Sequence, residues 1–121
     1  MNASVAFLNA PCGLTGHSQL SAAAQMYHHD LERLGFVKLF VYLTDVHESS
    51  GPHAVIPGTH RRRPEVLWED VRHSDAKLER EGVLESEVRI HGPAGTVLLV
   101  DTSMLHKGVQ RVDNARLILQ I

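Results

Sequence analysis

The chain has 121 residues, of which 43% are apolar and 21% charged, a composition typical of a globular domain and not of a disordered chain. Twelve Lys and Arg against 14 Asp and Glu give a formal charge of −2, which excludes a generally basic surface for nucleic acid. No apolar run approaches the roughly 18 residues that cross a bilayer, so the sequence does not predict a membrane-spanning protein. We therefore expect a single domain over residues 1–121, with neither nucleic acid nor a membrane as a partner.

The cysteine content and the first residues of the chain indicate where in the cell the protein is expected. The lone Cys12 cannot form a disulfide within the chain, so no extracellular disulfide framework is expected. The first ten residues lack the basic start and the long apolar core of a signal peptide. Together these features predict a cytoplasmic location.

Glycine and proline punctuate the chain at short intervals, and they separate short segments rich in Val, Ile, Leu and Thr, a pattern typical of an all-β sandwich or barrel. The strongest predicted strand covers residues 36–44, where both alternating faces are largely apolar, so we expect a central strand buried on two sides. Turns or loops are predicted over 45–52 and 91–95. Further strands are predicted over 53–56, 86–90 with Val88 and Ile90 inward, 96–100 as a nearly continuous buried run, 105–109 and 115–121.

One segment, residues 64–81, departs from the β pattern. Leu67, Val71 and Leu78 recur at helical spacing, and Gly82 suits the position after a helix. The segment predicts one amphipathic helix inserted in the β domain.

Nine histidines are present, and histidine is the commonest protein ligand for metal ions. A facial metal triad takes two His and one carboxylate, and in sequence it often reads His-x-Asp followed much later by a lone His. His28 and Asp30 form such a triplet just before the predicted central strand, where residues two apart project to the same side and can share an ion. The alternative for this triplet is a polar surface loop. A second triplet, His73 to Asp75, falls in the predicted helix, where a solvated helix face is expected.

Two residues near the end of the chain are further candidates. His106 follows the apolar run 96–100 and is either the third metal ligand or a hydrogen-bonded core residue. Arg116 lies inside the apolar stretch 115–121, and a buried cation needs an anionic partner. That partner is either a carboxylate of the chain, Asp101 or Asp113, or the carboxylate of a ligand, which a guanidinium binds through two parallel hydrogen bonds.

Six segments carry a family resemblance. They are QMYHHD at 25–30, FVYLTD at 40–45, GPHAVIPGTH at 51–60, GTVLLVDT at 95–102, LHKG at 105–108 and Arg116. In order and spacing they resemble the phytanoyl-CoA dioxygenase family, from about residue 25 to the end of the chain. The resemblance implies an all-β, double-stranded β-helix, which is a jelly-roll or cupin-like barrel, here with the inserted helix around 64–81.

The resemblance also implies a function. Members of the family are Fe(II)- and 2-oxoglutarate-dependent oxygenases, so the implied activity is the hydroxylation of a small-molecule substrate. By this resemblance His28, Asp30 and His106 are the catalytic iron ligands. Arg116 would bind the distal carboxylate of 2-oxoglutarate, and Gln25 would lie beside this cosubstrate. A halogenating relative would leave the coordination position of Asp30 vacant for halide, so an aspartate there favours hydroxylation.

The remaining polar candidates are weaker. Tyr27, Lys38 and Tyr42 are expected near the barrel mouth, with simple packing as an equal alternative. No metal-binding role is expected for His60. The other histidines are expected to be structural or exposed: His17, His29, His47, His53 and His91.

The chain is shorter than usual for the family, and three alternatives stay open: a minimal barrel, a fragment, or a domain completed by a partner chain. A short chain with two-faced apolar strands also predicts an exposed apolar surface and hence self-association into a homo-oligomer. The functional alternatives to the oxygenase are a catalytically inactive barrel that acts as a binding module, and a non-oxidative cupin-like metal protein. The latter would leave Arg116 without a ligand.

Overall fold

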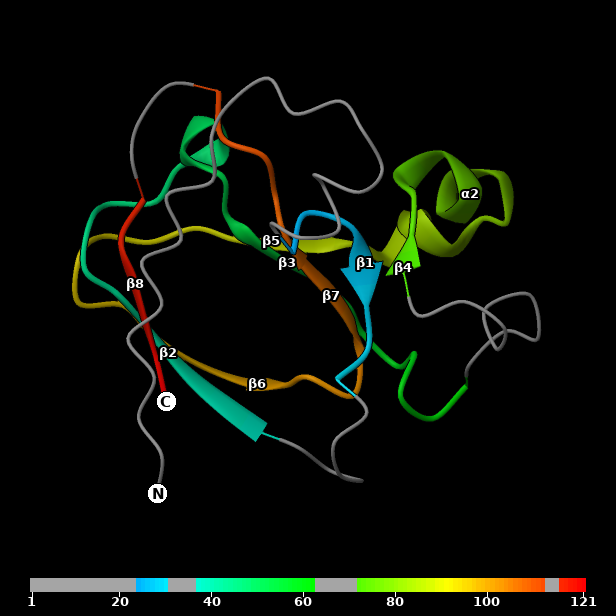
Figure 1. Cartoon of the computed structure of the whole chain (residues 1–121), viewed down its shortest axis with the longest axis horizontal. Coiled ribbons are helices and arrows are strands. Elements are labelled where there is room, and N and C mark those ends of the chain that lie inside the picture. The colour runs from blue at the N-terminus through cyan, green and yellow to red at the C-terminus, as the bar shows by residue number, and fades with distance from the viewer. Residues whose placement is uncertain (1–23, 31–36, 63–71, 113–115) are drawn as a thin grey trace.

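The computed structural model describes residues 24–30, 37–62, 72–112 and 116–121, and this part of the chain contains eight strands, one α-helix and two 3-10 turns (Figure 1). Within it, no helix combines the length and the apolar character needed to span a bilayer. The strands are β1 Tyr27–His28, β2 Val37–Tyr42, β3 His53–Ile56, β4 Arg72–His73, β5 Val88–Ile90, β6 Val97–Asp101, β7 Leu105–Gly108 and β8 Ile118–Gln120. The helix is α2 Asp75–Arg80, and the 3-10 turns are η1 Glu48–Ser50 and η3 Val83–Ser86.

The strands form two antiparallel sheets. One is five-stranded with the order β4-β1-β7-β3-β5, and the other is three-stranded with the order β6-β2-β8. From β5 onward, consecutive strands alternate between the sheets, so that β6 and β8 lie in the small sheet and β7 between them lies in the large one (Figure 1). This alternation is that of a double-stranded β-helix, and it confirms the predicted all-β, jelly-roll-like fold.

The main core lies between the two sheets. Because side chains alternate along a strand, each strand of the small sheet sends every second residue inward. The resulting cluster of buried side chains comprises Phe40, Tyr42, Val46, Val55, Leu98, Val100 and Ile118. The two faces that line this core also carry the polar site described below.

A second core lies on the other face of the five-stranded sheet, beneath α2 and η3. Leu78 of α2 is fully buried there against residues of β1, β3 and β7. The helix begins at Ser74, whose hydroxyl accepts a hydrogen bond from the backbone N–H of Lys77 at 3.3 Å. The five-stranded sheet is therefore covered on both faces.

The outer face of the three-stranded sheet is not covered in this way. Large apolar side chains exposed on β2, on β6 and just after β2 are Val37 (51%), Leu43 (45%), Val97 (59%) and Leu99 (74%). The expectation that 36–44 is buried on two sides and that 96–100 is a continuous buried run is therefore wrong. The inward orientation expected of Val88 is also wrong, because its side chain is 46% exposed. Apolar residues on both faces of a strand make burial favourable, but they do not supply a second layer to bury them.

The predicted helix over 64–81 is wrong over its central part. Within the described residues only Asp75–Arg80 is helical, whereas Arg72 and His73 form β4, which pairs with β1. Residues 64–71 lie outside the described part of the chain. Pairing with a strand more than 40 residues away in sequence overrides the helical periodicity at 72–73, and the Ser74 cap then starts a shorter helix.

Candidate functional site

Three candidate metal ligands meet on the inner face of the five-stranded sheet. His28 on β1 is the cross-strand partner of His106 on β7, and their ring centroids lie 4.3 Å apart. Asp30 reaches them because its backbone N–H donates to the carbonyl oxygen of Thr102 at 2.9 Å. The Asp30 carboxylate then has Oδ1 3.8 Å from His28 Nε2 and Oδ2 3.7 Å from His106 Nε2. One ligand atom from each residue lies within 4.8 Å of the other two, and no other such group occurs among the described residues.

Both imidazole rings are held in the same way. The Nδ1 atom of His28 lies 2.9 Å from the carbonyl oxygen of Met26, and Nδ1 of His106 lies 2.9 Å from that of Met104. Because a carbonyl only accepts, each Nδ1 carries the proton and donates it, which leaves the lone pair of each Nε2 facing Asp30. The donor set therefore fits a divalent ion such as iron(II).

The charge state of these ligands also suits a metal ion. Burial, and next the charge of His106, lower the pKa of His28 to about 4. Burial lowers the pKa of His106 as well. Burial raises the pKa of Asp30, but the hydrogen bond from Lys38 and the neighbouring positive charges outweigh it and hold that pKa below its usual value. At neutral pH the site therefore presents two neutral imidazoles and one carboxylate, which is the form that binds metal ions.

Lys38 contacts this group from the opposite sheet. Its Nζ lies 2.6 Å from Asp30 Oδ2, and both side chains are largely shielded from solvent. The ammonium group balances the carboxylate charge at the edge of the site. Of the three weaker candidates in the sequence, Lys38 is the one that the structure brings to the triad.

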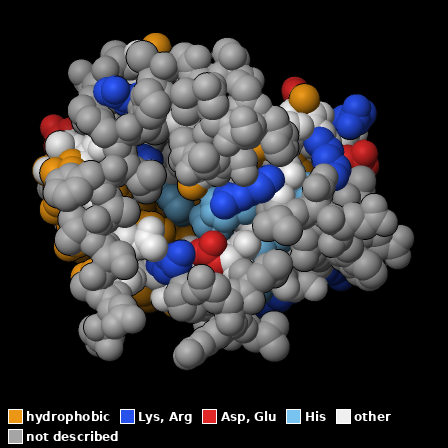
Figure 2. Space-filling model, viewed as in Figure 1, with side chains coloured by type: hydrophobic (Ala, Val, Ile, Leu, Met, Phe, Trp, Pro, Cys, Tyr) orange, Lys and Arg blue, Asp and Glu red, His pale blue; other side chains and the backbone are white. Residues whose placement is uncertain are grey.

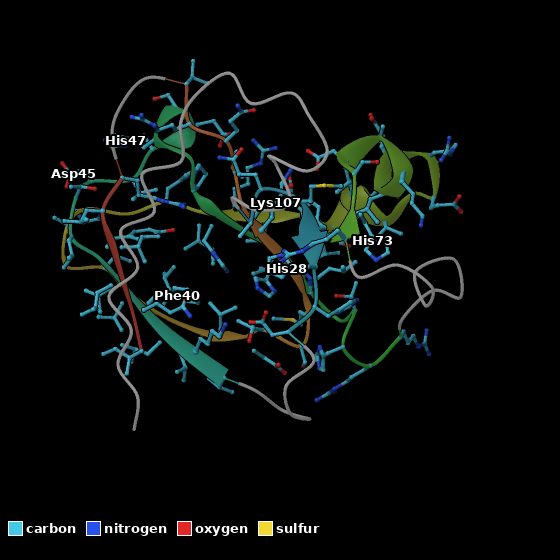
Figure 3. The ribbon with its side chains drawn as sticks, viewed as in Figure 1. His28, Phe40, Asp45, His47, His73 and Lys107 are labelled. Carbon is cyan, nitrogen blue, oxygen red and sulfur yellow. The ribbon has the colours of Figure 1, made fainter. Side chains whose placement is uncertain are left out.

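A cavity of about 160 Å³ opens beside the triad, between the two sheets. A cavity of this size accommodates a small organic molecule. Histidine side chains, with acidic and basic groups around them, gather near the centre of the face shown in Figure 2. In Figure 3, His28 on β1 and Phe40 on β2 point toward the space between the sheets. Besides His28 and His106, the cavity is lined by residues that include Gln25, Lys38, Phe40, His53, Gly108 and Arg116.

Arg116 provides a buried cation in this cavity. Its side chain is 6% exposed, and its guanidinium donates a hydrogen bond to the carbonyl oxygen of Gly51. A Cβ atom added at Gly108 would lie 3.1 Å from a guanidinium nitrogen, so the glycine makes room for this side chain. Among the described residues no carboxylate lies within ion-pair distance of Arg116. Asp101 accepts hydrogen bonds from Ser103 instead, one of them from its backbone N–H at 3.0 Å, and Asp113 lies outside the described part.

Two further buried side chains in the cavity have polar atoms without hydrogen-bond partners. Neither the amide oxygen nor the amide nitrogen of Gln25 is paired, and Nε2 of His53 is also unpaired. Burial, and next the charges of His106 and Arg116, lower the pKa of His53 to about 3, so its ring is neutral. Unpaired buried polar groups are costly, so they mark positions where polar atoms of a ligand would fit. Gln25 was predicted to lie here, whereas His53 was expected to be structural or exposed.

Tyr27 and Tyr42 take up packing positions. The hydroxyl of Tyr27 donates to Glu87, and its ring lies on the outer side of the sheet, 4.7 Å from Lys107 Nζ. The hydroxyl of Tyr42 donates to the carbonyl oxygen of Ile90 at 2.8 Å and accepts from the backbone N–H of His53 at 3.2 Å. Neither tyrosine lines the cavity.

The second His-x-Asp triplet lies apart from the site. His73 is fully buried on β4, near α2 (Figure 3), so its expected place on a solvated helix face is wrong. Asp75 is exposed and pairs with Nζ of the buried Lys107. The pairing of β4 with β1 removes His73 from solvent, and the triplet contributes to packing between β7 and α2.

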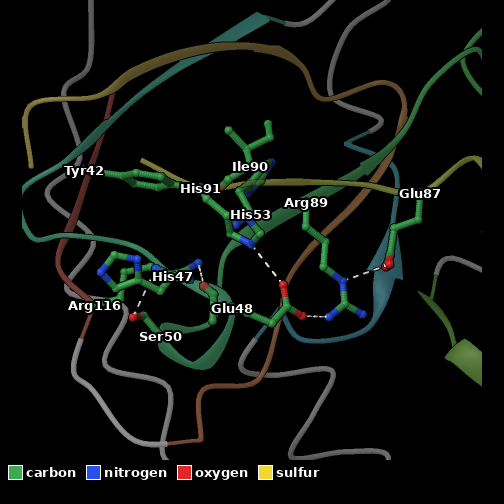
Figure 4. Close-up of polar contacts among 11 residues, drawn as sticks. Tyr42, His47, Glu48, Ser50, His53, Glu87, Arg89, Ile90, His91 and Arg116 are labelled. Atoms are coloured by element: carbon green, nitrogen blue, oxygen red, sulfur yellow. Dashed lines mark hydrogen bonds and ion pairs between the residues drawn. The ribbon is translucent and has the colours of Figure 1, made fainter. Parts of the chain in front are cut away.

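The other histidines have structural or exposed positions in the described residues. His29 Nδ1 lies 2.7 Å from the carbonyl oxygen of Ser103, and His47 and His60 are exposed. His91 is 46% exposed and contacts Glu48, which also accepts from Arg89 (Figure 4). These positions confirm the expectation for His29, His47 and His91, while His17 lies outside the described part.

The chain belongs to the phytanoyl-CoA dioxygenase family, because a family model described as Phytanoyl-CoA dioxygenase (PhyH) matches residues 9–115. One similar solved structure is EctD from S. alaskensis with 2-oxoglutarate and 5-hydroxyectoine. It has a TM-score of 0.55 and 20% identity over 78% of this chain and 36% of that chain. Another is HygX from Streptomyces hygroscopicus with nickel and 2-oxoglutarate, with a TM-score of 0.52 and 22% identity over 69% of this chain and 33% of that chain.

Both structures share the fold of this chain, which spans about a third of their length. No curated protein matches the chain.

Proposed function

We propose that this chain is a dioxygenase that uses Fe(II) and 2-oxoglutarate to hydroxylate a small molecule. The observation that carries the proposal is the buried guanidinium of Arg116, which has no carboxylate partner among the described residues and opens into the cavity beside the triad. Family membership supports the class of reaction, and the EctD and HygX structures with 2-oxoglutarate support the cosubstrate.

In this proposal His28, Asp30 and His106 would hold the ion beside the cavity. The carbonyl oxygens of Met26 and Met104 fix the two rings, so that Nε2 of each needs no rotation to bind. Lys38 keeps the carboxylate of Asp30 ionised and oriented. Bound iron would couple the oxidative decarboxylation of 2-oxoglutarate by O₂, which gives succinate and CO₂, to insertion of one oxygen atom into a substrate C–H bond.

Arg116 and Gln25 would bind the cosubstrate. A guanidinium presents two parallel N–H donors to a carboxylate, and burial strengthens such a pair. Arg116 would therefore take the distal carboxylate of 2-oxoglutarate, while the unpaired amide of Gln25 would supply a further hydrogen bond. With iron bound, Asp30 would take the coordination position that a halogenating relative would need for halide, which favours hydroxylation.

The proposal also includes the class of substrate and the bounds of the domain. EctD was solved with 5-hydroxyectoine and a further HygX structure with hygromycin B, which supports a small molecule as the substrate here. We take residues 1–121 as one domain. Self-association through the exposed apolar face of the small sheet also stays a prediction, and the mass in solution over a range of concentrations tests it.

Uncoupled turnover tests the proposed function. Purified protein with Fe(II), ascorbate, O₂ and 2-oxoglutarate should form succinate, and His106→Ala should form none. His91→Ala changes a half-exposed histidine away from the site and should match the wild type. Wild-type protein that binds the metal ion but forms no succinate would contradict the oxygenase and favour a metal-binding barrel without oxidative chemistry.

A further inference from the structure

We propose that His53 is an additional 2-oxoglutarate-binding residue, whose Nε2–H donates a hydrogen bond to the distal carboxylate beside Arg116. The inference rests on the proposed function, because it assigns a contact within the cosubstrate site. It adds a residue for which the sequence predicted only a structural or exposed position.

The strand register places His53 level with Arg116. On β7, residues 106 and 108 face the cavity in turn, and their partners on β3 are Val55 and His53, respectively. Gly108 is the position over which the guanidinium of Arg116 lies. His53 therefore stands one step along the strands from His106, in the row of the guanidinium and not in the row of the metal ligands.

Ring contacts agree with this placement. The His53 ring centroid lies 5.6 Å from that of His106 and 4.8 Å from that of Phe40 on the opposite sheet. These neighbours hold the ring against the cavity wall beside the triad, at the level of Gly108 and the guanidinium of Arg116. The close-up in Figure 4 includes both His53 and Arg116 among the polar side chains at this end of β3.

The Nε2 atom of His53 is available to donate a hydrogen bond to an anion. The residue is 5% exposed, and its Nε2 has no hydrogen-bond partner. A guanidinium uses at most two of the four lone-pair positions of a carboxylate, so a further donor is accommodated on the same group. A neutral N–H also adds no second positive charge next to Arg116.

Substitution of His53 by glutamine or asparagine distinguishes the contributions of the two ring nitrogens. Gln can bring its N–H close to the position of Nε2, Asn brings one only to the position of Nδ1, and Phe keeps the ring without either nitrogen. We would measure the affinity of Mn(II)-loaded protein for 2-oxoglutarate by calorimetry, without O₂, in wild type, His53→Gln, His53→Asn and His53→Phe. A hydrogen bond to a charged acceptor implies a loss of about tenfold in His53→Phe and His53→Asn, and a loss within about threefold in His53→Gln.

A second ligand tests whether His53 contacts the distal carboxylate. 2-Oxopentanoate has the same carbon chain without the distal carboxylate, so its affinity should be equal in all four proteins, as should the affinity for Mn(II). An equal loss of affinity for 2-oxoglutarate and 2-oxopentanoate would overturn the assignment to the distal carboxylate. If His53→Phe binds 2-oxoglutarate with unchanged affinity, the role of His53 is overturned and the proposed function stays intact. Wild-type protein that binds Mn(II) but not 2-oxoglutarate would overturn both.

Discussion

His28 and His106 are cross-strand partners whose rings lie 4.3 Å apart, and each ring is fixed by the carbonyl oxygen two residues earlier in the chain. The same local hydrogen bond thus occurs twice, once on β1 and once on β7. It turns both Nε2 atoms toward Asp30. The two rings are preorganised in this way, because the paired strands themselves set their spacing.

Removal of either histidine should abolish tight metal binding. We expect His28→Ala and His106→Ala to weaken Mn(II) affinity by more than about 100-fold, since even changes in the residues that support ligands cost 10- to 100-fold. Metal titration followed by calorimetry measures this. His73→Ala and His91→Ala are matched controls, because neither residue belongs to the group of converging ligands. Wild-type affinity in either ligand variant, or a loss in His73→Ala, would show that the ion binds elsewhere.

Arg116→Lys should separate recognition of the cosubstrate from packing. Lysine keeps the charge but loses the paired donors, so 2-oxoglutarate affinity should fall by about one to two orders of magnitude with metal affinity unchanged. Arg89→Lys, on the surface pair with Glu48, is the control. If Arg116→Lys lowers the melting temperature while its 2-oxoglutarate affinity stays within about threefold of wild type, Arg116 serves packing alone.

Gly51 should tolerate a side chain much less well than Gly58. Both have positive φ angles, 80° and 86°, but a Cβ at Gly51 would lie 2.4 Å from the carbonyl oxygen of Val109, whereas Gly58 faces open space. Gly58→Ala should cost about 1–2 kcal/mol of unfolding free energy from backbone strain alone. Gly51→Ala should cost clearly more, because the backbone must also shift. Urea unfolding compares the two variants, and equal costs would contradict the tight approach of the chain before β3 to the chain after β7.

The ion pairs of Glu48 should stabilise the fold only above acidic pH. Burial raises the pKa of Glu48, but the hydrogen bonds and positive charges of Arg89 and His91 together outweigh this and lower it. A carboxyl group with a lowered folded-state pKa stabilises the fold above its unfolded pKa of about 4.3, and the contribution is lost as the pH falls through the folded value. Because the pair is exposed, Glu48→Gln should cost about 0.2–1 kcal/mol at pH 7.

Urea unfolding of wild type and Glu48→Gln at pH 7 and near pH 3 checks this dependence. The difference between the two proteins should shrink toward zero at the lower pH. A difference of the same size at both pH values would mean that the glutamate acts through packing.

The sequence predicted the order of the strands better than the burial of their faces or their pairing. The strand over 53–56 has the predicted bounds, because Pro57 and Gly58 end it sharply. Within the predicted strand 36–44, Val37–Tyr42 form the central strand of the small sheet, but whether its second face is covered depends on layers that no local pattern encodes. For residues 72–73, the pairing with β1 decides the structure, and such a distant contact leaves no trace in helical periodicity.

The candidate site was likewise predictable only in part, because contacts between distant residues leave no local pattern in the sequence. His28, Asp30, His106 and Arg116 were predicted from motifs and a family resemblance, and the structure brings the first three together beside the fourth. His53 carried one usable signal, since it shares the inward face of its strand with Val55. Its relation to Arg116 follows from its register with Gly108 and could not be predicted from the sequence.

The most direct test is a crystal structure of the protein with Mn(II) and 2-oxoglutarate, grown without O₂. We expect one anomalous peak between the Nε2 atoms of His28 and His106 and the carboxylate of Asp30, with the distal carboxylate of 2-oxoglutarate on the guanidinium of Arg116. A metal ion bound at another group of residues, or 2-oxoglutarate bound away from Arg116, would contradict the account.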